Sequence, residues 1–401
     1  MGAPLAGIRV VEIASFVAVP ACGALLADLG AEVVKVEVPW GEIYRHTTPR
    51  LAGFDSDFPL GPAFNMDNRG KRSLALDLAL PQAQQALKQV VDQADVVITN
   101  LLPARLAKYG LDPETLLAER PELIVACLSG YGPLGERAND PAFDYTAFWA
   151  LSGLMDHIRD LDAPPAFMRP GVGDHSAALS LSVGILAALR TRDAEGHGQI
   201  IHVALQQIGF YINGNDAAMT LATGDTPPRH DRRAPRNPLW NHYPCQDGRW
   251  LFLVMIDSQR YWPSFTRAIG RPELAEDPRF ADPVWRYRSS RELVEILDTV
   301  FESRPLEKWI EPLSAERVIW APMQTLAEAV EDPVAIENGS FATVEPPDCV
   351  PFRTVAPPLK MSAHSMSGSR PAPALGADTP DVLAEAGVDD ETIALLIAVV
   401  E

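Results

Sequence analysis

The first 130 residues alternate short β-branched runs with segments of helical composition, and this alternation is the feature that most constrains the fold. Strands are expected at residues 8–13, 32–38, 74–78, 95–99 and 123–128, with helices at 20–29 and 81–94. Strands that alternate with helices are typical of a parallel sheet covered by helices on both faces. Ligands of such sheets bind at the carboxyl ends of the strands.

The α/β pattern continues to about residue 211 and then gives way to a different composition. A helix is expected at 175–192, a strand at 199–203 and a further helix from 204. Residues 223–238 are rich in Pro, Arg and Gly, which indicates a linker or mobile loop. Asp247 and Gly248 favour a hairpin turn between two strands. Later helices are expected at 258–269, 289–303 and 305–315, and after Thr379 and Asp389. We therefore expect a separate α+β unit over about residues 240–325.

The charge balance limits the classes of partner. Lys and Arg together number 34 against 53 Asp and Glu, which gives a formal net charge of −19. An acidic surface repels polyphosphate backbones, so we expect no nucleic-acid partner. Any anionic ligand must instead be bound by a local cluster of basic residues.

The four cysteines, Cys22, Cys127, Cys245 and Cys349, are far apart in the sequence. Because no CxxC spacing is present, we expect neither a zinc site nor a thioredoxin-like motif. Scattered thiols suit a reducing cytoplasm, which is the expected location. Cys22 and Cys127 lie in apolar runs and are expected to be buried.

No membrane partner is expected. Glu12 interrupts the apolar N-terminus, so it does not resemble a signal peptide. The most apolar stretch, residues 177–189, is shorter than the roughly 20 residues that a helix needs to span a bilayer. It is expected to form a buried helix.

Two groups of basic residues lie close to predicted strands of the sheet. Arg69, Lys71 and Arg72 stand just before the strand at 74–78, and Arg105 and Lys108 follow the strand at 95–99. Fixed cationic donors of this kind bind phosphate oxygens. A solvated turn is the alternative for the first group.

The segment 129–133, Ser-Gly-Tyr-Gly-Pro, directly follows the strand at 123–128. Glycines at the carboxyl end of a strand let a ligand approach the backbone closely, although any tight turn has similar composition. No GxGxxG follows the first strand, because residues 20–23 read Pro-Ala-Cys-Gly, so no nicotinamide cofactor is expected.

Asp144 precedes an apolar run that continues to Leu154 and is expected to be helical. An aspartate at such a position usually acts as a helix N-cap. A carboxylate at a helix N-terminus is also expected to keep a low pKa through the helix dipole and backbone N–H groups. A carboxylate nucleophile must be ionised, so Asp144 is the candidate nucleophile.

Taken in order, these runs resemble the class III CoA-transferases, the formyl-CoA and carnitine CoA-transferase family, over nearly the whole chain. The matching segments are residues 4–10, 29–37, 68–78, 95–100, 129–132, 143–145, 150–155, 184–189, 196–199 and 376–383. Each segment is weak evidence alone, but the ordered set is specific to the family.

The resemblance implies a Rossmann-like large domain with a parallel sheet, into which a smaller α+β domain is inserted, and two subunits interlocked as rings. The expected division is residues 1–222 for the first segment of the large domain, 223–239 for a linker, 240–328 for the small domain, and 329–401 for a linker and the return to the large domain.

The resemblance also implies residue roles. The catalytic residue is expected to be Asp144. Contacts with CoA are expected from Phe16, Val17, Ala18, Lys71, Arg72, Asn100, Leu101, Arg105, Lys108, Gly130 and Tyr131. Lys71 and Lys108 would hold the phosphates, and Gly130 and Tyr131 would flank the thioester.

The implied reaction moves CoA from an acyl-CoA thioester to a carboxylic acid. It passes through an aspartyl anhydride and an aspartyl-CoA thioester. Each step exchanges one activated acyl group for another, so no ATP, no metal and no cofactor beyond CoA as a substrate is expected.

Three other functions remain open from the sequence. CoA could move between two carboxylates of one dicarboxylic acid. A 2-methylacyl-CoA racemase would use a histidine before the motif aspartate together with a second aspartate. Asp174 matches the second aspartate, but Phe143 occupies the histidine position. A non-catalytic acyl-CoA binder would require Asp144 to lie outside the cleft.

The basic stretch 229–236 is either a solvated loop or a segment that binds a substrate carboxylate. Trp240, His242 and Tyr243 form either an acyl pocket or core packing of the small domain. His197 and His202 have no partner nearby in the sequence and are expected to be structural or exposed.

Overall fold

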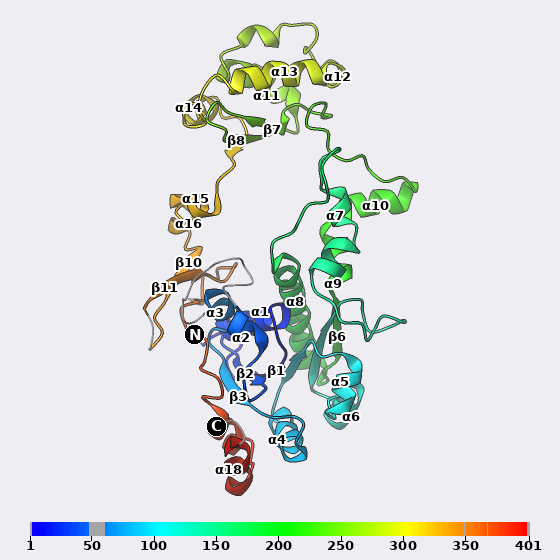
Figure 1. Ribbon diagram of the computed structural model, residues 1–401, viewed down its shortest axis with the longest axis vertical. Coiled ribbons are helices and arrows are strands. Elements are labelled where there is room, and N and C mark those ends of the chain that lie inside the picture. The colour runs from blue at the N-terminus through cyan, green and yellow to red at the C-terminus, as the bar shows by residue number, and fades with distance from the viewer. Residues whose placement is uncertain (1, 48–60, 348–349, 367, 399–401) are drawn as a thin grey trace. The chain divides into compact units, whose positions relative to one another are not determined.

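The computed structural model describes residues 2–47, 61–347, 350–366 and 368–398. The chain divides into two compact units (Figure 1). The first comprises Met1–Asp156, Phe167–Thr226 and Val334–Glu401, and the second comprises His157–Ala166 and Pro227–Pro333. The short segment His157–Ala166 belongs to the second unit, a detail that the boundaries expected from composition do not include.

The first unit is built on a parallel sheet of six strands in the order β3-β2-β1-β4-β5-β6. The strands are β1 (Arg9–Ile13), β2 (Glu32–Glu37), β3 (Arg72–Ala75), β4 (Val96–Thr99), β5 (Ile124–Ser129) and β6 (Ile200–Ala204). The central strands are buried along almost their whole length, as their β-branched composition requires of a sheet covered on both faces. The fold class expected from the sequence is therefore confirmed for this sheet.

The first unit also contains helices, several of which pack against the sheet (Figure 1). They are α1 (Ala18–Asp28), α2 (Ile43–Thr47), α3 (Pro62–Asn68), α4 (Pro81–Val91), α5 (Pro103–Lys108), α6 (Pro113–Glu119), α7 (Leu154–His157), α8 (Val172–Glu195), α9 (Leu205–Ile212), α10 (Gly214–Thr223), α17 (Thr379–Glu385) and α18 (Asp390–Ala398). Residues of α4, α17 and α18 share one apolar cluster with β1, β2 and β4. The C-terminal segment therefore packs in the same unit as the N-terminal strands. A hairpin of β10 (Phe341–Val344) and β11 (Phe352–Val355), not expected from the sequence, also belongs to this unit.

Helix α8 is longer than expected and is, by length and composition, able to cross a membrane. It packs instead on α1, β5 and β6, with Ala177, Leu181, Ile185 and Ala188 fully buried. The buried face identifies α8 as a core helix of this unit.

Of the two thiols expected to be buried in this unit, Cys22 is buried and Cys127 is only partly buried. Cys349 lies outside the described residues.

The second unit contains an antiparallel sheet of β7 (Trp240–Pro244), β8 (Trp250–Val254) and β9 (Trp320–Pro322). Gly248, with φ of 75°, makes the expected turn between β7 and β8. The accompanying helices are α11 (Ser258–Ala268), a 3-10 helix (Pro272–Ala275), α12 (Pro283–Arg288), α13 (Ser290–Phe301), α14 (Glu307–Ala315) and α15 (Leu326–Ala329), with α16 (Pro333–Glu337) at the boundary. Tyr243 is fully buried in this unit's aromatic core and donates its hydroxyl proton to Pro238 O (2.7 Å), so it serves packing. Trp240 is more than half exposed, and His242 is partly buried against Trp250.

The segment after Asp144 differs from the single helix expected from its apolar run. Tyr145–Ala150 form a π-helix, Gly153 breaks the chain direction with φ of 87°, and α7 starts at Leu154. Ser152 donates its hydroxyl proton to Phe148 O, which satisfies a carbonyl at the end of the π-helix. Short π-helical segments occur frequently at functional sites.

Candidate active site

The carboxyl ends of β1 and β4 are joined by one side chain. Asn100, just after β4, accepts a hydrogen bond from Ser15 N (3.2 Å) and donates one to Ser15 O (2.7 Å). This amide therefore fixes the turn between β1 and α1, which contains Phe16 and Val17 and leads into Ala18, the first residue of α1. The structure thus brings these three residues and Asn100, with its neighbour Leu101, to one edge of the sheet.

The Phe16 turn also reaches the loop that carries Asp144. The Phe16 ring meets the Phe143 ring edge-on, with centroids 5.3 Å apart. Phe143 is 54% exposed, so this aromatic pair faces outward beside the aspartate. Val17 and Ala18 are buried, which leaves mainly their backbone for contact with a ligand.

Asp144 is held by the first turn of α8. Its Oδ2 accepts a hydrogen bond from Gly171 N (3.1 Å), and the N–H groups of Gly173 and Tyr145 also donate to the carboxylate. A Cβ on Gly173 would lie 2.8 Å from Asp144 Cβ, so only glycine permits this approach. The carboxylate therefore lies against the N-terminus of a 24-residue helix, where the helix dipole favours an anion.

The surroundings of Asp144 do not give the low pKa that the sequence suggested. The residue is only 3% exposed. This burial raises the pKa of its carboxyl group above the usual range, and the three backbone donors only partly oppose the effect. The expectation of a low pKa for the carboxyl group at this position is therefore wrong.

Asp174 is the second carboxyl group of the site, one residue beyond Gly173 in the same first turn of α8. It is partly exposed, and among the described residues its carboxylate has no hydrogen-bond or ion-pair partner. Burial, and then the negative charge of Asp144, raise the pKa of Asp174 to about 7, while His175 opposes the shift. At neutral pH a large fraction of this carboxyl group is ionised, with its oxygen lone pairs unused.

His175 forms an ion pair beside the two aspartates. Its Nε2 lies 3.0 Å from Asp67 Oδ1, although the two residues are 108 positions apart in the sequence. Burial favours the neutral ring, but the hydrogen bond and charge of Asp67 outweigh it and raise the pKa of His175. The protonated ring of His175 is therefore favoured next to Asp174. No motif in the sequence signals this pair, because Asp67 comes from the end of α3.

The two basic groups expected to bind phosphate have different surroundings. The Lys71 side chain is 0% exposed, and its ammonium pairs with Glu12 Oε2 at 2.7 Å. It also donates to Pro20 O, Asp67 O and Asn68 Oδ1, each at 2.9 Å. Burial lowers the pKa of Lys71 to about 8, despite the opposing charge of Glu12. Because its donors are used inside the protein, Lys71 is not placed to hold a CoA phosphate.

Arg72 is likewise committed to other carboxylates. It pairs with Glu32 and Glu385, each at 2.7 Å, and it opens β3 at the amino edge of the sheet. Arg69, close to it in the sequence, pairs with Asp28 at 2.7 Å. The expectation that Arg72 assists phosphate binding is not supported, because the ligand edge is at the other end of the strands.

Arg105 and Lys108, in contrast, are exposed on α5, the helix that follows β4. Within the described ranges neither pairs with a carboxylate, and Lys108 contacts the ring of Tyr109. These two cations remain available for an anionic ligand.

Gly130 and Tyr131 follow β5 at the same edge of the sheet. A Cβ on Gly130 would lie 2.3 Å from Ala142 Cβ, so this glycine lets the Asp144 loop pack closely. Tyr131 lies beneath the Arg137 guanidinium, which is 3.6 Å from the ring centroid. The N–H of Gly132 donates to Ser129 Oγ (3.0 Å), so it is not free to bind a ligand.

Potential metal ligands do not gather at this site. In the part of the chain that the structure describes, no group of three or more His, Cys, Asp or Glu side chains is arranged to hold a metal ion.

The fold and the site together define a class of protein: an α/β enzyme scaffold with paired carboxylates and free cations at the ligand edge of a Rossmann-like sheet. The model of CoA-transferase family III matches residues 5–379. The chain therefore belongs to CoA-transferase family III, and it is a CoA-transferase.

Several relatives support this assignment over nearly the full length. The succinyl-CoA:mesaconate CoA-transferase of Haloarcula marismortui is 33% identical over 398 residues, with 98% of each chain covered. The (R)-2-hydroxy-4-methylpentanoate CoA-transferase of Clostridioides difficile is 29% identical over 389 residues, with 97% of each covered. The crystal structure of a CAIB/BAIF family protein from Brucella suis superposes with a TM-score of 0.84 at 29% identity, covering 96% of this chain and 100% of that one.

Proposed function

We propose that this enzyme transfers CoA from an acyl-CoA to a carboxylic acid through a covalent aspartyl intermediate, and that the carrier is Asp174 rather than Asp144. The observation that supports this assignment is the difference in access. Asp144 is buried with its carboxylate bonded by three backbone N–H groups, whereas Asp174 is partly exposed with no bound partner among the described residues. A nucleophile needs a free lone pair that can reach the thioester.

The proposed reaction starts with the ionised carboxylate of Asp174. One of its oxygens attacks the thioester carbonyl, the C–S bond breaks, and CoA leaves as a thiolate, which gives a mixed anhydride. The thiolate attacks the Asp174 carbonyl and releases the donor acid, leaving an aspartyl-CoA thioester. The acceptor carboxylate displaces the thiolate to form a second anhydride. The thiolate then attacks the acceptor carbonyl, forming the new acyl-CoA and regenerating Asp174.

Asp144 and His175 are proposed to adjust the reactivity of Asp174. The negative charge of Asp144 raises the pKa of its neighbour, and a more basic carboxylate is a stronger nucleophile. The His175–Asp67 pair places a cation close by, which offsets part of that charge and keeps a useful fraction of Asp174 ionised. The first turn of α8 adds its dipole to the anionic intermediates.

CoA is proposed to bind along the edge of the sheet that leads to α8. Arg105 and Lys108 are available to bind its phosphates. The Phe16 turn, with Asn100 and Leu101, is proposed to contact the pantetheine and adenine. Gly130 and Tyr131 are proposed to flank the thioester.

The working assembly is proposed to be an interlocked homodimer. Helices α9 and α10 expose Phe210, Tyr211, Ile212, Met219 and Leu221, side chains that a partner surface would cover.

The function is tested by incubating the enzyme with succinyl-CoA, the donor in the name of the Haloarcula marismortui relative, and a panel of carboxylic acids. Chromatography with mass detection then measures each new acyl-CoA. Consumption of succinyl-CoA matched by formation of a new acyl-CoA, with ping-pong kinetics, is expected for at least one acid. Hydrolysis to free CoA with every acid would contradict transfer.

A further inference from the structure

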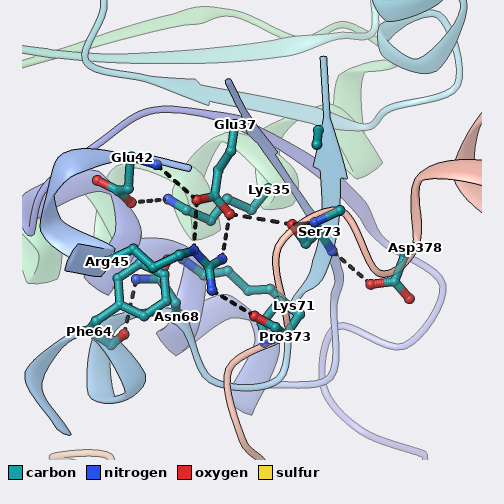
Figure 2. A network of polar contacts seen from close by, with 12 residues as sticks. Lys35, Glu37, Glu42, Arg45, Phe64, Asn68, Lys71, Ser73, Pro373 and Asp378 are labelled. Carbon is teal, nitrogen blue, oxygen red and sulfur yellow. Dashed lines mark hydrogen bonds and ion pairs between the residues drawn. The ribbon is translucent and has the colours of Figure 1, made fainter. Parts of the chain in front are cut away.

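A cluster of four buried charges lies beneath the Phe16 turn. Lys35, on β2, pairs with Glu12 Oε1 at 3.0 Å and with Glu42 Oε1 at 2.6 Å. Glu12 pairs in turn with Lys71 at 2.7 Å. Figure 2 shows the Lys35–Glu42 contact between β2 and the segment before α2. The charges are balanced, so the cluster can be buried without a net charge.

Glu42 uses its second oxygen to hold the Phe16 backbone. Glu42 Oε2 accepts a hydrogen bond from Phe16 N at 2.5 Å. Phe16 has φ of 65°, and within the described ranges only Phe16 and Arg317 have positive φ without being glycine. The left-handed conformation is costly for a residue with a Cβ and persists only where the surroundings impose it. A short bond to a buried carboxylate is such a constraint.

The Phe16 conformation decides what the turn presents to the site. Its ring packs edge-on against Phe143 at 5.3 Å and lies 6.4 Å from the Tyr44 ring. Phe143 directly precedes Asp144. A change of φ at Phe16 would therefore move both the backbone and the ring at the mouth of the site.

The same cluster also touches the segment that supports α8. The Lys71 ammonium donates to Asp67 O and Asn68 Oδ1, each at 2.9 Å. Asp67 uses its side chain to hold His175 at 3.0 Å, next to Asp174. One buried network thus supports both the Phe16 turn and the first turn of α8.

We propose that Glu42, anchored on Lys35, is a positioning residue that keeps Phe16 in its left-handed conformation and so preforms the surface on which CoA settles. The proposal rests on the proposed function, because it assumes that the Phe16 turn contacts CoA. Glu42 itself is buried beneath the turn and contacts no substrate.

The test measures CoA binding by titration calorimetry on the full-length enzyme, independently of any acyl group. Glu42→Gln keeps the size of the side chain but weakens its hold on Phe16 N. CoA is expected to bind about tenfold more weakly, the factor that corresponds to the usual cost of a left-handed residue. If Glu42→Gln does not fold, Glu42→Asp, which keeps the charge but withdraws the oxygens, is measured in its place with the same expectation.

Asp28→Asn is the matched control. Asp28 forms a buried ion pair with Arg69 at 2.7 Å, so its loss also disturbs a buried charge. It lies at the far end of the 11-residue helix α1, about 15 Å along the axis from the Phe16 turn. This variant is expected to lose stability while binding CoA as the wild type does.

Phe16→Gly separates positioning from general stability. Glycine adopts positive φ without strain, so a turn with glycine at position 16 no longer needs the Glu42 bond to hold its shape. In a double-mutant cycle, Glu42→Gln is therefore expected to weaken CoA binding less in the Phe16→Gly background than in the wild type. Equal losses in both backgrounds, or unchanged CoA binding in Glu42→Gln, would overturn the proposal.

The same cycle distinguishes this proposal from the proposed function. If the wild type binds no CoA, the proposed function fails, and the wild-type titration alone shows this. If the wild type binds CoA but the coupling between positions 16 and 42 appears only in thermal unfolding and not in CoA affinity, the positioning role alone fails.

Discussion

Two regions of the site each place an aspartate at the first turn of α8, and the structure gives them opposite surroundings. Asp144, on the loop after β5, is buried, and its carboxylate accepts hydrogen bonds from three backbone N–H groups. The helix itself leaves Asp174 partly exposed, with a pKa of about 7. This contrast indicates that carboxylate chemistry depends less on the residue type than on which oxygens remain unbonded. The charge of the buried aspartate then becomes a means of adjusting the exposed one.

The largest effect is expected from removing each carboxylate in turn. Asp174→Ala should lower transfer from succinyl-CoA by at least about a thousandfold, because the covalent carrier is lost. Asp144→Asn keeps the shape of the buried side chain and should retain measurable transfer. Steady-state assays of both variants, checked for folding by circular dichroism, decide between the two residues. The opposite ranking would return the carrier role to Asp144.

The next effect concerns how the thioester reaches Asp174. Arg105→Ala combined with Lys108→Ala should raise the KM for acyl-CoA by about tenfold with little change in kcat, because two phosphate-binding cations are lost. Arg72→Ala is the control, since its guanidinium is already paired with Glu32 and Glu385. If Arg72→Ala raised KM and the double variant did not, the phosphates would bind at the amino ends of the strands and not at the carboxyl ends.

A smaller effect should appear in the pH profile. The attacking carboxylate must be ionised, so kcat/KM should rise with pH through about 7. Asp144→Asn removes a negative neighbour and should move the rise to lower pH, increasing the relative rate at pH 6 by about threefold. His175→Gln removes the ring whose positive charge lowers the pKa of Asp174, so it should move the rise to higher pH. Shifts in the same direction for both variants would show that Asp174 is not the titrating group.

The smallest effect is one of stability. A carboxyl group whose folded pKa is raised stabilises the fold fully below its unfolded pKa of about 4, and this contribution is lost as the pH rises through about 7. Asp174→Asn stays neutral throughout. Its melting temperature should therefore exceed that of the wild type by about 2–4 °C at pH 8 and match it at pH 4. A variant less stable than the wild type at pH 8 would mean that the carboxylate is not strained in the fold.

The sequence predicted the sheet well because alternation of β-branched runs and helices is a local signal. All six strands of the parallel sheet begin at or within two residues of the expected start, and the Gly248 turn was correctly anticipated, whereas the β10–β11 hairpin was missed. The π-helix after Asp144 was missed, since an apolar run of that length is equally compatible with an α-helix.

The site was predicted less well because its properties depend on burial and on distant pairs. Lys71 was expected to be a phosphate ligand, but it serves a buried network whose partner Glu12 is 59 residues away. The His175–Asp67 pair joins two helices that no sequence motif connects. The sequence favoured Asp144 over Asp174 as the nucleophile, because a position before an apolar run does not reveal which carboxylate is buried and which faces outward.

The most direct test of the proposed mechanism is to find which aspartate carries the acyl group. The enzyme is incubated with succinyl-CoA, trapped with hydroxylamine, and digested with trypsin. Cleavage is expected to place Asp144 in the peptide of residues 138–159 and Asp174 in the peptide of residues 160–190, because Pro170 blocks cleavage after Arg169. We predict a hydroxamate on the second peptide, at Asp174. A hydroxamate on the first peptide would contradict the assignment of Asp174 as the carrier.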